Sequence, residues 1–74
     1  MAETLDALVP GDSCRVTSLQ LPPPKQRGMQ ELGLTVGSTV TALHRGPWGG
    51  IAAYGVLDTV VALRDCDARH ITVA

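Results

Sequence analysis

The 74-residue sequence has no phenylalanine, one tryptophan and one tyrosine, so aromatic side chains make up only 3% of it. Hydrophobic residues still account for 45% of the chain, which is typical of a globular protein and excludes a disordered one. The core is therefore expected to consist of Leu, Val, Ile and Ala. A chain of this length is expected to form a single domain over residues 1–74, with a thin core that buries about 60% of the extended surface.

The sequence also lacks a run of basic residues. Six lysines and arginines stand against seven aspartates and glutamates, which gives a formal net charge of -1. Proteins that bind nucleic acid need a basic face to contact the phosphates. Nucleic acid is therefore not expected to be the main partner.

Cysteines are few, and long apolar runs are missing. Cys14 and Cys66 lie far apart, whereas a secreted domain of this size normally carries several disulfides. The N-terminal segment MAETLDALVP has neither the basic nor the apolar region of a signal peptide, and no stretch is long enough to span a membrane. We expect a cytoplasmic protein with reduced thiols and no direct membrane insertion.

What the sequence does contain is a series of short strand signals separated by turn residues. Strands are expected at residues 14–21, 38–45, 51–56, 59–64 and 70–73, with a loop at 46–50 and a turn at 65–68. Residues 25–33 fit a short helix, on which Met29 and Leu32 would share a face. Closing the strands into a barrel would remove exposed sheet edges. The sequence therefore predicts a mostly β fold, a small barrel of about five strands with one short helix after the first strand.

Two glycines near the middle of the chain, Gly33 and Gly37, mark the end of this helix and the turn into the next strand. Gly33 fits the position just past a helix, where a left-handed backbone is needed and glycine adopts it at little cost. Leu34 would then pack back against the helix, as the apolar residue that accompanies such caps. Gly37 is expected in the turn that follows.

Cysteine and histidine are present in the numbers of a zinc site but not in its spacing. The residues concerned lie in four different segments and include no C-x-x-C pair. Only Cys66 and His70 are close in sequence, so they are the candidates if a metal is bound at all. The alternative is small core cysteines and surface histidines. We expect no cofactor, with adventitious zinc or iron binding left open.

Signatures of catalysis are absent from the sequence. It has no G-x-S-x-G motif around a serine and no G-x-x-x-x-G-K-[ST] phosphate loop. Asp65 and Asp67 flank Cys66 but are more typical of a turn than of an acid–base pair. An enzyme is therefore not expected.

The remaining candidates are residues that would contact a partner. Trp48, preceded by Pro47, is expected either to cap one end of the barrel or to project as an interface anchor, a role in which tryptophan is enriched. Arg45 would flank the same end. On the predicted helix, the exposed candidates are Lys25, Arg27 and Gln30.

Taken together, four segments of the chain resemble the FeoA family of ferrous iron transport accessory proteins. These are LVPGDSCRV, MQELGLTVGSTV, HRGPWGG and VALRDCDARHITV, which cover nearly the whole chain. The sequence departs from the family pattern at Gly28, where a basic or helix-forming residue is usual, and at Val36, where proline is frequent. In addition, PWGG replaces a commoner Pro-Leu-Gly-Asp loop. These differences fall on the helix and the loop.

The resemblance implies an SH3-like β-barrel with a short helix after the first strand. It also implies a non-enzymatic cytoplasmic protein that binds and regulates the cytosolic G-protein region of FeoB, a membrane permease for ferrous iron. Its oligomeric state stays open. The alternative is a metal-responsive or nucleic-acid-associated SH3-like module, as at the C-terminus of iron-dependent repressors. The chain's own Met1, the lack of a winged helix and the net charge are expected to disfavour that alternative.

Overall fold

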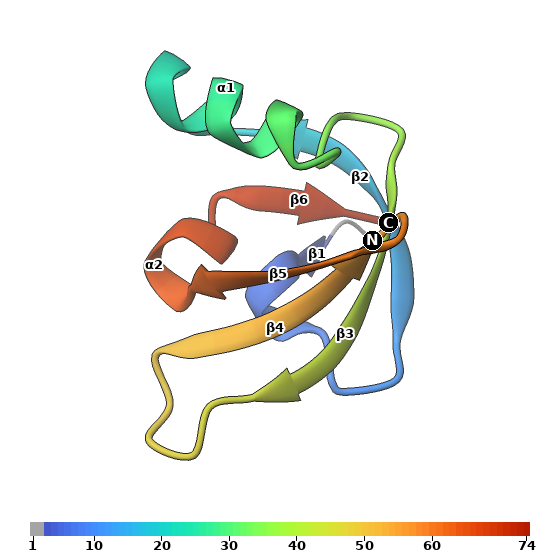
Figure 1. Cartoon of the computed structure of the whole chain (residues 1–74), viewed down its shortest axis with the longest axis vertical. Helices are drawn as coiled ribbons and strands as arrows, with labels where there is room; N and C mark the ends of the chain where they lie inside the picture. Colours follow the sequence, from blue (N-terminus) through green and yellow to red (C-terminus); the bar gives the residue numbers. More distant parts are fainter. Residues whose placement is uncertain (1–2) are drawn as a thin grey trace.

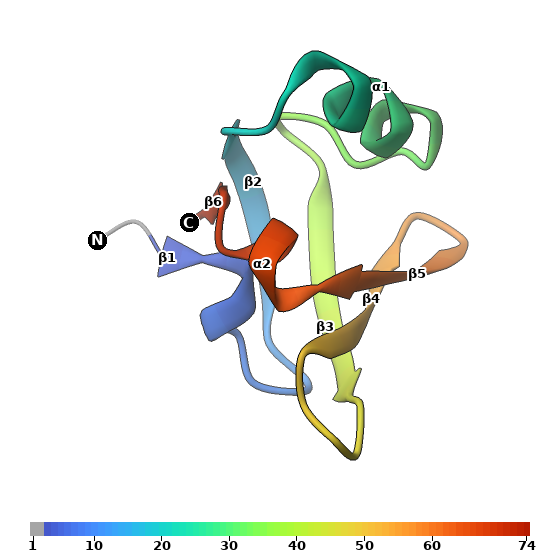
Figure 2. The ribbon, with the colours of Figure 1, turned by 90° about the vertical axis from the view of Figure 1, so that its left-hand side faces the viewer.

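The structure, a computed structural model, describes residues 3–74. Its elements in chain order are β1 (Glu3–Thr4), the 3-10 helix η1 (Leu5–Ala7), β2 (Ser13–Leu19), α1 (Pro23–Glu31), β3 (Thr39–Arg45), β4 (Ile51–Val56), β5 (Thr59–Arg64), α2 (Asp65–Ala68) and β6 (Ile71–Val73). Helix α1 lies at one end of the molecule and the β3–β4 loop, residues 46–50, at the other (Figures 1 and 2). None of the helices within residues 3–74 is long and apolar enough to cross a membrane.

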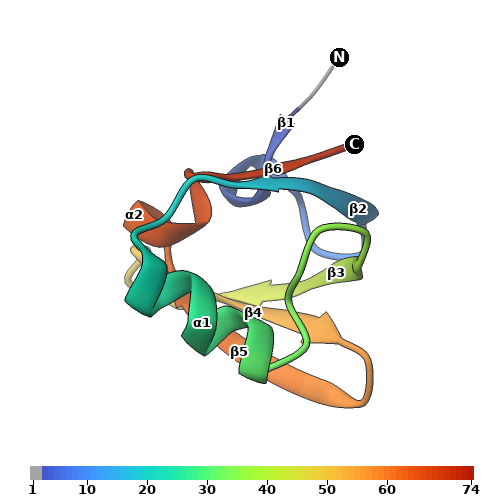
Figure 3. The ribbon, with the colours of Figure 1, turned by 90° about the horizontal axis from the view of Figure 1, so that it is seen from above.

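The six strands form one sheet, in the order β1-β6-β2-β3-β4-β5, with antiparallel pairing throughout. The mostly β fold is thus confirmed. The sheet curls around the core (Figure 3), but over the described residues its edge strands β1 and β5 do not pair with each other. The expected closure into a barrel is therefore wrong. After β5 the chain passes through α2 and pairs with β1 and β2 as strand β6, instead of pairing with β5.

The number of strands and the position of the helix also differ from the prediction. The structure adds β1, a strand of two residues, which is too short to give an alternating pattern in the sequence. The strand taken as the first is β2, so the single predicted helix, α1, follows the second strand rather than the first. The other four predicted strands correspond to β3, β4, β5 and β6.

The core is aliphatic, as the composition predicts, with one exception. Tyr54 of β4 is the largest of the fully buried side chains, and its exposed fraction is only 1%. The other large side chains that are fully buried are Leu5, Leu34, Ile71, Val16, Val40, Val56 and Val73. They come from η1, the segment after α1 and the strands β2, β3, β4 and β6, so the core joins these elements.

The end of α1 has the geometry predicted for Gly33, whose φ is +91°. The amide of Gly33 donates to the carbonyl of Gln30 at 2.9 Å, and the amide of Leu34 donates to that of Met29 at 2.9 Å. This pair of bonds is the Schellman motif, and Leu34 is completely buried, so the cap prediction is confirmed. Leu32, by contrast, is exposed and does not share the buried position of Met29.

The segment after the cap is held against β2 by backbone and side-chain bonds. Gly37, with φ of +95°, donates its amide to the carbonyl of Val16 at 2.8 Å, and the amide of Val16 donates to the carbonyl of Ser38 at 2.9 Å. The hydroxyl of Ser38 donates to the carbonyl of Gly33 at 2.8 Å. The turn expected at Gly37 is present, and it fixes the start of β3.

Residues 65–68, expected as a turn, form the four-residue helix α2. The amides of Arg69 and His70 donate to the carbonyls of Asp65 and Asp67 at 3.0 and 3.1 Å. Both aspartates lie in the first turn, where a carboxylate is favoured by the helix dipole. Ala68 is completely buried, so α2 closes the core at the point where the chain crosses from β5 to β6.

Candidate partner-binding surfaces

The β3–β4 loop presents the single tryptophan to solvent. The amide of Gly46 donates to the carbonyl of Ile51 at 2.8 Å, and the carbonyl of Gly50 accepts the amide of Asp65 at 2.9 Å. The loop is therefore fixed at its base, while Trp48 at its tip has an exposed fraction of 96%. Pro47 is exposed as well. Of the two readings of Trp48, a cap on the barrel end is wrong, and a projecting side chain is what the structure has.

Arg45 lies at the end of β3. The regular alternation of inward and outward side chains along this strand does not predict the direction in which Arg45 points. The pairing of β3 with β4 shifts between Ala42 and His44, which marks a β-bulge. A bulge adds one residue to a strand and so inverts the alternation beyond it. His44 now faces outward and is exposed, and Arg45 is paired with the buried Ala52.

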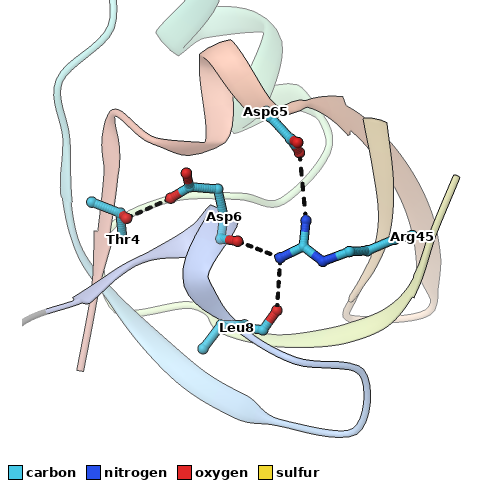
Figure 4. A network of polar contacts seen from close by, with 5 residues as sticks. All are labelled: Thr4, Asp6, Leu8, Arg45 and Asp65. Carbon is cyan, nitrogen blue, oxygen red and sulfur yellow. Dashed lines mark hydrogen bonds and ion pairs between the residues drawn. The ribbon is translucent and has the colours of Figure 1, made fainter. Parts of the chain in front are cut away.

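The guanidinium of Arg45 is occupied within the molecule (Figure 4). Its Nη2 donates to the backbone carbonyl of Asp6 and, at 3.1 Å, to that of Leu8. Its Nη1 lies 3.7 Å from Oδ1 of Asp65. Arg45 thus ties the segment around η1 to β3 and α2, and its role in the structure is to join these elements. Whether it also contacts a partner stays a prediction.

Two polar atoms near this arginine, one of them on Asp65, are not satisfied by hydrogen bonds among the described residues. Within residues 3–74, the hydroxyl of Tyr54 and Oδ1 of Asp65 are buried and have no hydrogen-bond partner. Burial raises the pKa of the Tyr54 hydroxyl, and the positive charge of Arg45 partly opposes this rise. A buried hydroxyl of this kind favours its neutral form.

Helix α1, which carries the other candidates, lies at the opposite end of the molecule from the β3–β4 loop (Figures 1 and 2). Nζ of Lys25 donates to Oδ1 of Asp67 at 2.7 Å, and this hydrogen bond raises the pKa of Lys25. Lys25 therefore links α1 to α2, although half of its side chain is exposed. Arg27 and Gln30 are exposed. Helix α1 and the β3–β4 loop are therefore two separate candidate surfaces.

The metal candidates Cys66 and His70 lie at the surface and are close in sequence to Asp65 and Asp67. Cys66 is exposed on α2, His70 is exposed in the turn that follows, and Cys14 is half-buried on β2. Among the residues described, no group of three or more His, Cys, Asp or Glu side chains is arranged to hold a metal ion.

Sequence reasoning missed a groove of about 600 Å³ on the outer face of the sheet. Thr41, Leu43, Gly55 and Leu57 contribute to its lining. Leu57, in the turn between β4 and β5, has an exposed fraction of 84%. One signal was available in the sequence: β4 reads IAAYGV, which is apolar on both faces, whereas a strand with one solvated face normally alternates.

Comparisons with known proteins agree with this fold. A family model described as the FeoA domain matches residues 3–74. No curated protein sequence matches the chain. A solution structure of FeoA from Chlorobium tepidum is 30% identical, with a TM-score of 0.90 over 95% of this chain and 67% of that one.

Two other solved structures extend the comparison. FeoA from Stenotrophomonas maltophilia, solved with zinc and described as a prokaryotic SH3 domain protein and candidate ferrous iron transport activating factor, is 32% identical, with a TM-score of 0.80 over 96% of this chain and 88% of that one. A manganese-dependent transcriptional repressor is 24% identical, with a TM-score of 0.87 over 99% of this chain and 41% of that one. At this identity the likeness to the repressor concerns the fold alone.

Proposed function

The chain belongs to the FeoA family, and on that premise we propose that it is a non-enzymatic accessory protein of ferrous iron uptake. It acts in the cytoplasm, where it binds and regulates the cytosolic G-protein region of a FeoB-type permease. The relative from S. maltophilia, described as a candidate transport activating factor, supports this role. The protein carries no resident cofactor, and its effect on transport comes through contact with the permease.

The observation that carries the proposal is the exposure of Trp48. A tryptophan with 96% of its surface in water, on a loop whose base is fixed by backbone hydrogen bonds, loses much apolar exposure when a partner covers it. Such side chains dominate the binding free energy of many interfaces. A rigid base also lowers the entropy lost on binding, because the loop is already ordered.

The test is a titration of the purified cytosolic region of the ferrous permease with this protein, with and without guanine nucleotide. We expect saturable binding that differs between the nucleotide states, together with a change in the GTPase rate. Absence of binding in every nucleotide state would refute the proposal. Metal content is measured on the same preparation, and we expect neither stoichiometric zinc or iron nor a change of melting temperature with chelator.

A further inference from the structure

The outer face of β3, β4 and β5 exposes several large apolar side chains. In the cross-strand register, Thr41 lies beside Gly55 and Gly55 beside Val60. Ala53 lies beside Ala62 in the row towards the β3–β4 loop. Val60 has an exposed fraction of 66%, and Leu43 and Ile51 are also exposed. Exposed apolar side chains that adjoin one another in this way mark interaction sites.

The middle of this face is hollowed at Gly55. With no side chain there, the groove passes over the backbone of β4, between Leu43 and Leu57. A Cβ placed on Gly55 would have the side-chain atoms of Leu43 as its nearest neighbours, at an ordinary contact distance of 3.7 Å. The hollow is therefore a space that a side chain can enter, and nothing in the backbone of Gly55 demands glycine.

One wall of the groove is strained. Leu57 has φ of +55° and is the single non-glycine residue with positive φ among residues 3–74. A hairpin turn that needs positive φ normally takes Gly, Asn or Asp there, and another residue costs about 1–3 kcal/mol. The Leu57 side chain lies near Gly33 at the end of α1 but stays 84% exposed, so this contact recovers little of the strain. A partner that covers the side chain would recover more.

The pairing of the strands restricts what can occupy the groove. Its floor is formed by β3 and β4, which lie inside the sheet and are hydrogen-bonded to neighbours on both sides. An extended segment laid across them would leave its own backbone groups without partners from this surface. A helix satisfies its backbone internally and presents a ridge of apolar side chains. The groove therefore favours a helix over an added strand as its occupant.

The charges around the face define the occupant further. Arg15 is paired with Thr39 at one corner, and Arg64 is paired with Ile51 at the diagonally opposite corner. Strands β2 to β5 carry no carboxylate, and the acidic residues that adjoin them in sequence are Asp12 before β2, Asp58 in the turn next to Leu57 and Asp65 at the start of α2. Charge complementarity requires acidic side chains on both flanks of the apolar ridge.

We propose that the groove over Gly55 binds an acidic amphipathic helix of a partner protein, with one bulky apolar side chain inserted between Leu43 and Leu57. Strand β4 spans about 17 Å, which corresponds to a helix of about three turns. Such a helix would extend from Leu57 to the β3–β4 loop and so would be continuous with the contact proposed for Trp48. The assignment of this helix to the permease rests on the proposed function. The chemistry of the groove does not depend on that function.

The test uses two probes against the full chain. The first is a synthetic helical peptide of about three turns, with Leu at i, i+3, i+4 and i+7 and Glu on both flanks, and a matched peptide with Lys in place of Glu. The second is the cytosolic region of the permease. We expect the acidic peptide to shift the amide resonances of Thr41, Gly55 and Leu57, and the Lys peptide to bind more weakly.

The most informative variant is one that fills the hollow over Gly55. Gly55→Val places two methyl groups in the groove and should weaken binding of the acidic peptide at least about tenfold, the loss of one contact worth about 1.4 kcal/mol. Gly28→Ala adds a Cβ in open space on α1 and is the matched control. If Gly55→Val fails to fold, Gly55→Ala serves, because its Cβ meets Leu43 at contact distance.

The outcomes separate the two proposals. No binding of the acidic peptide to the parent protein, or equal binding to Gly55→Val, overturns the groove proposal. Peptide binding that Gly55→Val abolishes, without any binding of the permease region, supports the groove and refutes the proposed function. If both probes bind and Gly55→Val weakens only the peptide, the permease helix is not the occupant, and the assignment of the groove to the permease is wrong.

Discussion

Leu57 lies over Gly33, with its Cδ1 atom 3.0 Å from the point where a Cβ on Gly33 would stand. Both residues have positive φ, and they belong to the end of α1 and the β4–β5 turn. The helix end and the hairpin turn therefore meet at Gly33. Glycine at position 33 adopts the backbone conformation that the cap needs, and its lack of a side chain leaves room for Leu57.

Replacing Gly33 with valine should be strongly destabilising. A β-branched residue at φ of +91° is strained by about 1–3 kcal/mol. It must also move the Cδ1 atom of Leu57, which is the end of an exposed side chain and can shift at little cost. Chemical denaturation should show a loss of about 2 kcal/mol or more. Gly37→Ala is the control: its φ is also positive, but a Cβ there meets nothing within 4 Å, so only the strain of about 1 kcal/mol remains. Equal stability of the two variants would contradict this account.

The cap at Gly33 could be predicted because its chemistry is local: a helix, a glycine and an apolar residue in succession. The position of the Arg45 side chain could not be predicted from the sequence. Strict alternation along β3 from the buried Val40 and Ala42 would turn His44 inward and Arg45 outward. The bulge at Leu43 inverts this order, and no residue type near it signals a bulge. The groove was missed for a similar reason, since it depends on the register that sets Thr41 beside Gly55.

Arg45→Met should destabilise the protein by about 2 kcal/mol, because it leaves the carbonyls of Asp6 and Leu8 and the carboxylate of Asp65 without their cation. Arg45→Lys should recover only part of the loss, since an ammonium group cannot reach several acceptors as the planar guanidinium does. Urea denaturation at neutral pH measures both.

The neighbouring histidine provides the control for this prediction. His44 faces outward and is exposed, so His44→Met should change the free energy of unfolding by no more than about 0.5 kcal/mol. A large loss at His44 with none at Arg45 would mean that β3 keeps its alternation and that the bulge is wrong.

Tyr54→Phe should leave the protein as stable at pH 7 as the parent, or slightly more stable. Among the described residues its buried hydroxyl has no hydrogen-bond partner, and removing such a group abolishes its desolvation penalty without loss of a bond. A loss of more than about 1 kcal/mol would show that the hydroxyl has a partner in solution.

The same variant should change the alkaline limb of the stability curve. The pKa of Tyr54 is raised above its usual value of 10.0, so the folded state keeps its proton where the unfolded state has lost it. Stability is then complete below pH 10.0 and falls as pH rises through the folded pKa. Tyr54→Phe should decline less steeply than the parent above pH 10.0. The pKa of Lys25 is also raised, so Lys25 also lowers stability as pH rises. The Tyr54→Phe variant keeps this part of the alkaline loss.

Trp48→Ala should separate binding from stability. The side chain is almost fully exposed, so its removal should leave the melting temperature unchanged. If the loop is the proposed anchor, truncation of a tryptophan at an interface centre costs about 2 kcal/mol or more, which weakens binding to the permease region about thirtyfold. Trp48→Phe keeps an apolar ring on the same loop and should lose much less affinity.

Because Trp48 is the single tryptophan of the chain, its fluorescence reports on the contact without a label. Emission from an indole in water lies at long wavelength, and it should shift to the blue when the permease region or the acidic peptide covers the loop. The shift should saturate at the same concentration as the binding curve. Gly55→Val then shows whether the β3–β4 loop and the groove form one binding surface or two. If the loop and the groove receive the same helix, filling the groove should weaken the fluorescence response and the binding together. If the blue shift persists at the parent's affinity in Gly55→Val, the loop binds its partner without the groove.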